Sequence, residues 1–378
     1  MCGYISYFRE SVRKKLQFIA LWVLLLLPII SLSQETLLKP YTLELNYFYG
    51  NIARHTRDIA PLITGHPRGF VASYNRKTYG FNEWERRYNY PDWGFSFIYQ
   101  DLDNESIGDV FGLYSHYSFY FLKRSAYLKV GQGIGYATNP FDIIDNKKNT
   151  AFGSHLLSAT FLQLNYQKTL FKNISVQAGL TVTHYSNGNV RAPNNSANSI
   201  TANVGVVYTP KNQTIPDFIP NEKTKYTEPL RFNFVLRGGI NQSDRLGLGQ
   251  HPFYIASAFV DKRVSKISTL QLGVEAFFAE FLREQIAFEA IALPGLGTRG
   301  DEDWKRVGVF IGHELRFGRI ALVTQLGYYV YYPYDFEGRV YARVGLKRYF
   351  GKNFFGVVTV KAHGAKAEAV EFGIGYRL

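Results

Sequence analysis

The chain has 378 residues, a formal net charge of +13 and one cysteine, Cys2. Because Cys2 lies in a predicted leader, the remaining chain lacks disulfides, thiol nucleophiles and cysteine-bound metal sites. The 28 tyrosines, 30 phenylalanines and 34 glycines, with a single methionine, favour strands over helices. In an exported protein the positive charge alone does not indicate nucleic acid, and we expect no nucleic-acid partner.

Residues 1–33 predict a cleaved signal peptide. Four basic residues precede a largely apolar run at 16–32, which ends in the small-x-small site Ser31-Leu32-Ser33. The alternative is a retained membrane anchor, for which the run is nearly long enough, but Pro28 and the small residues favour removal. We therefore expect the folded domain to comprise residues 34–378.

The rest of the chain repeats one pattern, a segment of alternating apolar and polar residues ended by turn residues. This is the sequence signature of an antiparallel outer-membrane β-barrel. The predicted strands are 41–50, 68–75, 92–101, 107–122, 125–139, 155–169, 172–186, 198–210, 229–241, 252–263, 267–281, 304–316, 318–332, 336–349, 353–363 and 367–377.

These strands predict an all-β fold, a single transmembrane barrel of about 12 to 16 strands. The stretches 76–90 and 211–228 are long enough to be linkers, but strands of the same kind precede and follow 211–228, which favours one barrel. With the amino terminus in the periplasm, most long connections face outward, as barrels of this kind require. The outward connections are 51–67, 140–154, 187–197, 242–251 and 282–303.

The predicted strand 172–186 ends in His184, Tyr185 and Ser186. Its even positions are mostly apolar and its odd positions mostly polar, and side chains alternate between the two faces of a strand. The outer wall of a large barrel is apolar and faces lipid, so we expect the even positions of this strand on the outer wall. His184 and Ser186 are among them and lie at the extracellular end. The next strand has the same parity, which brings Asn198 to the same place.

Polar groups that face lipid are unfavourable unless they have a use. An imidazole can take the proton of a serine hydroxyl during attack on an ester, a third group orients the imidazole, and N–H donors hold the oxyanion. Here His184 and Ser186 are the candidate base and nucleophile. Asn187 and the backbone amides around Gly188 are the available oxyanion donors, although the Asn187-Gly188 pair is also an ordinary hairpin turn.

The stretch His184-Tyr185-Ser186-Asn187 at the end of a barrel strand resembles the active site of the lipid A 3-O-deacylases, the PagL or acyloxyacyl hydrolase family. Three further stretches resemble the longer members of that family: "NPFDIIDNKKNTAFGSHL", "GVFIGHELRFGRIALVTQLGYYVY" and "VKAHGAKAEAVEFGIGYRL". The resemblance implies an outer-membrane serine hydrolase that removes an ester-linked acyl chain from lipopolysaccharide. It assigns the base to His184, the nucleophile to Ser186 and an oxyanion contact to Asn187.

The third catalytic position departs from the family pattern. The better-known short members have a glutamate there, and by spacing the corresponding residue is Asn198. An amide oxygen can orient the imidazole, but it brings no charge to stabilise the imidazolium. Asp142 or Asp145 in the preceding outward loop is the alternative third member, and an inactive descendant that only binds lipid is another interpretation.

The remaining expectations concern partners. Lys147, Lys148 and Arg191 lie in outward loops and are candidates for pairing with lipid A phosphates, although basic loop residues also simply solvate a barrel rim. The other histidines have no metal-ligand spacing, so we expect neither a metal nor a cofactor. The competing function is a passive channel, which would place its polar groups in the lumen. The sequence does not determine whether the protein forms a homodimer.

Overall fold

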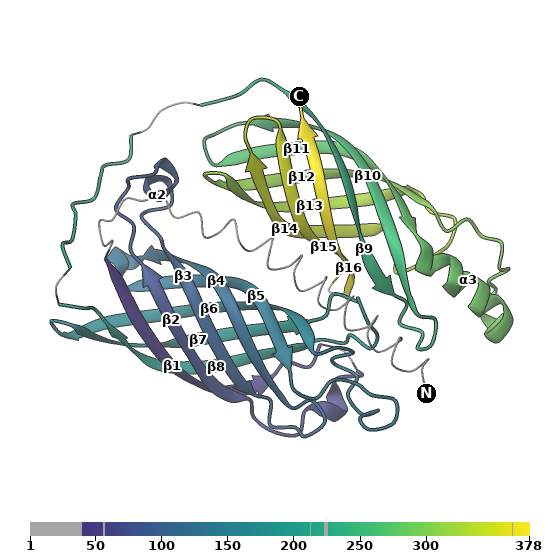
Figure 1. The fold of residues 1–378 in the computed structure, drawn as a ribbon, viewed down its shortest axis with the longest axis horizontal. Helices are drawn as coiled ribbons and strands as arrows, with labels where there is room; N and C mark the ends of the chain where they lie inside the picture. Colours follow the sequence, from purple (N-terminus) through teal and green to yellow (C-terminus); the bar gives the residue numbers. More distant parts are fainter. Residues whose placement is uncertain (1–39, 56, 212, 223–225, 365) are drawn as a thin grey trace, which may run out of the picture. The chain divides into compact units, whose positions relative to one another are not determined.

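The computed structural model describes residues 40–378 except 56, 212, 223–225 and 365, so the predicted signal peptide lies outside the described residues. Sixteen strands make up most of this part of the chain (Figure 1). Their bounds are β1 Tyr41–Ile52, β2 Arg68–Arg76, β3 Asp92–Asp101, β4 Asp109–Phe121, β5 Ala126–Ala137, β6 Leu156–Phe171, β7 Ile174–Ser186, β8 Ala197–Tyr208, β9 Arg231–Gln242, β10 Gln250–Arg263, β11 Ser268–Ala279, β12 Arg306–Phe317, β13 Ile320–Tyr331, β14 Val340–Phe350, β15 Phe354–His363 and β16 Lys366–Arg377.

The all-β fold and all sixteen predicted strands are confirmed, but their closure into one barrel is wrong. Strand β8 pairs with β1, and β16 pairs with β9, so the chain forms two closed antiparallel barrels of eight strands each. The described residues of the stretch 209–230 between them, all but 212 and 223–225, contain no strand and form a linker. Alternation tells which face of a strand is buried, but it is the same in one large barrel and in two small ones, so it could not reveal which strands close the sheet.

The alternation itself follows the expected rule in both barrels. Inward positions are buried and mostly polar, whereas outward positions carry large exposed apolar side chains such as Leu180, Ile200, Leu236 and Ile311. This distribution is the reverse of a water-soluble barrel and is typical of one whose wall faces lipid.

Barrel 1, formed by β1–β8, has a lumen filled with polar side chains that bond to one another. Lys129 and Glu44 form an ion pair with 2.6 Å between Nζ and Oε2, and both are buried. Gln177 and Tyr127 also donate to Glu44. An eight-stranded barrel is just wide enough for its own side chains, and this lumen is used in that way.

Barrel 2, formed by β9–β16, is filled in the same manner but with more charge. Arg343 contacts Glu275 at 2.9 Å and Glu371 at 2.6 Å, and all three side chains are fully buried. Arg237 lies between the same two carboxylates. Removing such charges from water is unfavourable unless they are paired, and here each one has a partner of opposite sign.

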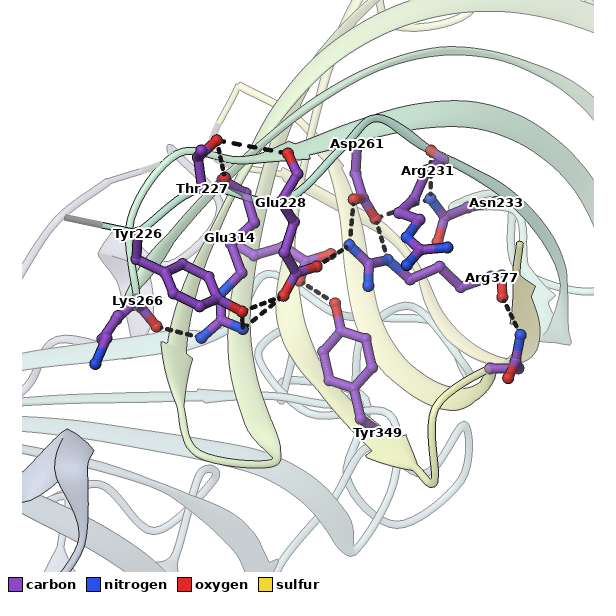
Figure 2. A network of polar contacts seen from close by, with 12 residues as sticks. Tyr226, Thr227, Glu228, Arg231, Asn233, Asp261, Lys266, Glu314, Tyr349 and Arg377 are labelled. Atoms are coloured by element: carbon purple, nitrogen blue, oxygen red, sulfur yellow. Dashed lines mark hydrogen bonds and ion pairs between the residues drawn. The ribbon is translucent and has the colours of Figure 1, made fainter. Parts of the chain in front are cut away.

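The end of the linker is attached to barrel 2 by a second polar network. Glu228 accepts hydrogen bonds from Tyr226, Arg263 and Arg377, and Arg377 also pairs with Asp261 (Figure 2). Burial alone would raise the pKa of Glu228, but these three donors outweigh it and lower the pKa to about 2. The network thus ties the linker to the last strand through a carboxylate that stays ionised.

The strand prediction left out the short helical segments. These are α2 Glu83–Arg87 and α3 Glu280–Ala292, with the short turns η2 Ala60–Leu62, η3 Leu122–Arg124 and η4 Pro294–Leu296. They occupy connections between strands. Among the described residues, no helix is long and apolar enough to span a membrane.

Candidate active site

The predicted parity of β7 and β8 is confirmed. Odd residues of β7 such as Thr181 and Thr183 are fully buried in the lumen, whereas even residues face outward. His184 pairs directly with Asn198 in the strand register, at the end of the barrel where β7 passes into the 187–196 loop. The candidate base therefore lies on the outer wall near its rim.

The structure brings His184 and Asn198 into contact. Nδ1 of His184 and Oδ1 of Asn198 are 2.6 Å apart. Because a carboxamide oxygen only accepts, the bond assigns the ring proton to Nδ1 and leaves Nε2 unprotonated in the neutral ring. This is the tautomer in which Nε2 can accept a proton from a nucleophile.

Ser186 lies on the same face, but the 187–196 loop covers it, so that only 5% of it is exposed. Its Oγ donates to Oδ1 of Asn194 at 3.1 Å and accepts from the Gly188 N–H at 3.0 Å. Among the hydrogen bonds of the described residues, none joins Ser186 to the His184 ring. The hydroxyl must turn from Asn194 toward His184 before the ring can take its proton.

Sequence reasoning missed Asn194. Its Oδ1 also accepts from the backbone N–H of Asn187 at 2.9 Å, so one carboxamide holds both the candidate nucleophile and the start of the loop. The four asparagines within residues 187–195 were the available signal, but a polar loop contains such residues for many reasons.

The candidate oxyanion donors are engaged in the turn that follows the strand. Asn187 donates from Nδ2 to the Arg191 carbonyl at 2.5 Å, and its Oδ1 accepts from the Asn189 N–H at 3.0 Å. Gly188 has a φ of +63°, which glycine adopts without steric penalty and which directs its N–H at Ser186. Of the two, Gly188 therefore provides a donor that points at Ser186.

The 187–196 loop, which covers Ser186, is held in place by residues of other connections. The Asn195 and Ser196 N–H groups donate to the Thr150 and Ala151 carbonyls, at 3.1 and 3.2 Å. The imidazole of His55 adds a third attachment, with Nε2 at 2.8 Å from the Asn195 carbonyl. The segment that covers Ser186 is therefore held on both sides by other connections of the same barrel.

The alternative third members do not reach the imidazole in the described contacts. Asp142 accepts from the N–H groups of Asp145 and Ile144, and these donors lower the pKa of Asp142. The Asp142 carboxylate is therefore occupied by N–H groups of its own turn. No hydrogen bond of the described residues joins either Asp142 or Asp145 to His184, whereas Asn198 is in direct contact.

The candidate phosphate ligands are all exposed. Lys147 and Lys148 lie in the loop that contains Asp142, and Arg191 lies in the loop that covers Ser186. The positive charge of Arg191 contributes to lowering the pKa of Asp142. Within the described part of the chain no group of histidines, cysteines and acids could hold a metal ion.

Comparisons with known proteins show the family to which the chain belongs. Residues 68–207 match the family model described as lipid A 3-O-deacylase (PagL), and residues 230–378 match the model described as acyloxyacyl hydrolase, C-terminal domain. No curated protein matches the chain. The first match covers β2 to β8 of barrel 1, and the second covers all of barrel 2.

The solved structures that match are outer-membrane barrels of low similarity. CdiB from Acinetobacter baumannii has 11% identity and a TM-score of 0.19; the match covers 90% of this chain and 60% of CdiB. A triple mutant of Rhodopseudomonas blastica porin has 10% identity and a TM-score of 0.20, with 89% and 100% of the two chains covered. OccAB3 from A. baumannii has 10% identity and a TM-score of 0.21, with 90% and 98% covered. These scores are too low to support an argument, but the two family models cover most of the chain, and the protein belongs to the lipid A 3-O-deacylase (PagL) family of outer-membrane hydrolases.

Proposed function

We propose that barrel 1 is a serine hydrolase that removes the ester-linked acyl chain at position 3 of lipid A in the outer leaflet. The observation that carries the proposal is the hydrogen bond between His184 and Asn198, on the outer wall and two residues from Ser186. A base oriented by an acceptor, beside a serine and open to lipid, is suited to an ester that arrives from the membrane.

The proposed reaction has two halves. Ser186 Oγ attacks the ester carbonyl while its proton passes to Nε2 of His184, and the C–O bond to the sugar breaks as the leaving oxygen takes that proton. The acyl chain is then bound to Ser186 as an ester. Water attacks this ester, gives its proton to Nε2 and releases a fatty acid, and Oγ regains the proton.

The tetrahedral intermediates require donors for the oxyanion. The Gly188 N–H lies beside Ser186 Oγ, and the Asn187 N–H, which donates to Asn194 Oδ1, is the second candidate donor. Lys147, Lys148 and Arg191 would pair with the phosphates of lipid A beyond the rim. Three of the four connections of ten or more residues in barrel 1, 53–67, 138–155 and 187–196, lie at this same end, which in barrels of this kind faces outward.

The channel alternative receives no support from the lumens. The inward side chains of both barrels are buried and bonded to one another, as in the pair formed by Lys129 and Glu44 or the triad around Arg343. The feature that is open to its surroundings is the outer wall, where His184 lies.

The decisive experiment is mass spectrometry of lipid A from cells that produce the wild type, Ser186→Ala or the control Ser175→Ala. Ser175 is a buried serine at the opposite end of the same strand, so its substitution tests the barrel and not the site. We expect a lipid A species that lacks one acyl chain with the wild type and the control only. Full deacylation by an inserted Ser186→Ala protein would refute the serine mechanism.

A further inference from the structure

The loop that covers Ser186 is attached to barrel 2 as well as to barrel 1. Both barrels belong to one compact unit, Pro40–Leu378. The described hydrogen bonds to other connections of barrel 1 hold Asn195 and Ser196, at the end of the loop. Its earlier part, residues 188–192, instead contacts β9, β10 and β16 of barrel 2. Barrel 2 therefore contributes directly to the surroundings of the candidate site.

Gln242, the last residue of β9, forms most of this attachment. The described pairing of β9 with β16 stops at Gly238, so β9 continues beyond its last partner on that side. Asn189 takes the place of a strand partner: its carbonyl accepts from the Gln242 N–H at 2.9 Å, and its Nδ2 donates to the Gln242 carbonyl at 3.0 Å. Both residues are buried. Buried backbone groups at an open strand edge need partners, and here the loop of barrel 1 provides them.

Two glutamine side chains continue the attachment along the loop. The Ala192 N–H donates to Oε1 of Gln242 at 3.3 Å. Nε2 of Gln250 donates to the Val190 carbonyl at 2.7 Å. Gln242 and Gln250 are register partners on β9 and β10. One pair of neighbouring residues of barrel 2 therefore holds three residues of the loop, Asn189, Val190 and Ala192.

Gly188 is in close contact with the wall of barrel 2. A Cβ atom at this position would be 2.2 Å from Cγ2 of Val370 on β16, which is closer than real Cβ atoms approach other atoms. Glycine is therefore required here by the space as well as by its positive φ. The N–H of the same residue donates to Ser186 Oγ at 3.0 Å. The residue that supplies the candidate oxyanion donor thus lies between Ser186 and barrel 2.

A glycine N–H keeps its direction only if the residues around it are held, because glycine has no side chain that restricts φ and ψ. An oxyanion donor has to be directed before the charge develops. We propose that barrel 2 is a positioning element of the hydrolase: Gln242 and Gln250 hold the loop residues that follow Gly188 and so keep its N–H directed at the reacting centre. This inference rests on the proposed function, in which the Gly188 N–H stabilises the oxyanion.

The first test compares the full-length wild type with the double variant Gln242→Ala/Gln250→Ala in mixed micelles of lipid A. Outright loss of an oxyanion donor costs about 100- to 1000-fold in kcat, and a donor that is loosened but retained should cost less. We therefore expect kcat to fall about tenfold with KM unchanged. The control is Arg283→Ala, at the same end of barrel 2, which removes an exposed side chain paired with its neighbour Glu284 and should leave kcat unchanged.

An unchanged kcat in the double variant would overturn the positioning role. A higher KM at constant kcat would overturn it as well, because barrel 2 would then act on substrate binding and not on the chemical step. An equal fall of kcat in Arg283→Ala would also contradict it, since any change at this end of barrel 2 would then have the same effect.

A reversible link provides a second test within one protein. The only cysteine of the chain is Cys2, in the predicted leader, so Asn189→Cys with Gln242→Cys introduces the only thiols of the folded domain. A backbone hydrogen bond joins these two positions, and a disulfide spans such a separation. We expect the disulfide to form on oxidation, with kcat near that of the wild type in the oxidised protein and lower after reduction.

Failure of the disulfide to form, or equal kcat in the oxidised and reduced proteins, would overturn the positioning role. A wild type that deacylates no lipid A would instead overturn the proposed function, and disulfide formation would still report whether barrel 2 holds the loop.

Discussion

Replacing Asn198 tests the least usual part of the proposed site. Its Oδ1 is 2.6 Å from Nδ1 of His184, and this bond fixes the orientation and tautomer of the ring. Asn198→Ala removes the acceptor at the start of a strand, on the outer face, and creates no core cavity. Asn198→Asp keeps the shape and the acceptor and adds a negative charge.

The two variants should change turnover in opposite directions. A neutral hydrogen bond is worth about 0.5–1.5 kcal/mol, so Asn198→Ala should lower kcat by about 2- to 12-fold. A hydrogen bond to a charged group is worth about 1.5–3 kcal/mol, which is about 1–1.5 kcal/mol more than the neutral one, so Asn198→Asp should raise kcat by about 5- to 13-fold at neutral pH. The Coulomb attraction between charges about 4 Å apart, about 4 kcal/mol at an effective dielectric of 20, is the upper limit, because the carboxylate also loses hydration.

The assay is single-turnover release of fatty acid from lipid A in mixed micelles, with barrel content checked by circular dichroism. Single-turnover rates separate the chemical step from product release. Wild-type rates in Asn198→Ala together with an inactive Asp142→Ala or Asp145→Ala would refute the reasoning, since the third member would then come from the 138–155 loop. A slower Asn198→Asp would equally contradict it, because charge would then not help the imidazolium.

Three further outcomes follow from the structure. Ser186→Ala and His184→Ala should each abolish most deacylation, and the double variant should be scarcely slower than either, because base and nucleophile act as a unit; additive losses in rate assays would contradict this. Arg343→Met leaves Arg237 alone between two buried carboxylates and should lower the free energy of unfolding by about 3–5 kcal/mol in urea titrations, against no change for the exposed turn variant Lys352→Ala. The lowered pKa of Glu228 stabilises the linker attachment fully at pH values above the ordinary carboxyl range, and this stabilisation is lost as the pH falls through about 2. In limited proteolysis at pH 4, the linker should therefore be protected in the wild type and cleaved faster in Glu228→Gln. Equal cleavage of the two proteins would disprove the role of Glu228.

The sequence was sufficient for everything that depends on local alternation. The even positions of β7 and β8 predicted that His184 and Asn198 share the outer face, and the structure pairs them directly. Strand positions were equally accessible, because each strand ends at turn residues. Asn198, and not Asp142, is the residue that contacts the imidazole, as its spacing indicated.

What the sequence could not provide depends on contacts between distant strands. The closing pairs β1 with β8 and β9 with β16 leave no mark on the pattern of either strand, so one barrel was predicted where two exist. The cover over Ser186 and the carboxamide of Asn194 depend on how two loops pack together. The hydrogen bonds of that cover with Gln242 and Gln250 join residues 50 to 60 positions apart in the sequence, which alternation does not reveal.

Closure of each sheet on its own eighth strand has a consequence for how the protein reaches the membrane. Barrel 1 is topologically complete at Tyr208, so its last edge can be sealed before any residue of the following 231–377 segment has paired. An open sheet edge is a template for pairing with other chains, and each such edge persists here for only half of the chain. Insertion can thus proceed as two successive closures of moderate contact order, each free of exposed strand edges when it ends.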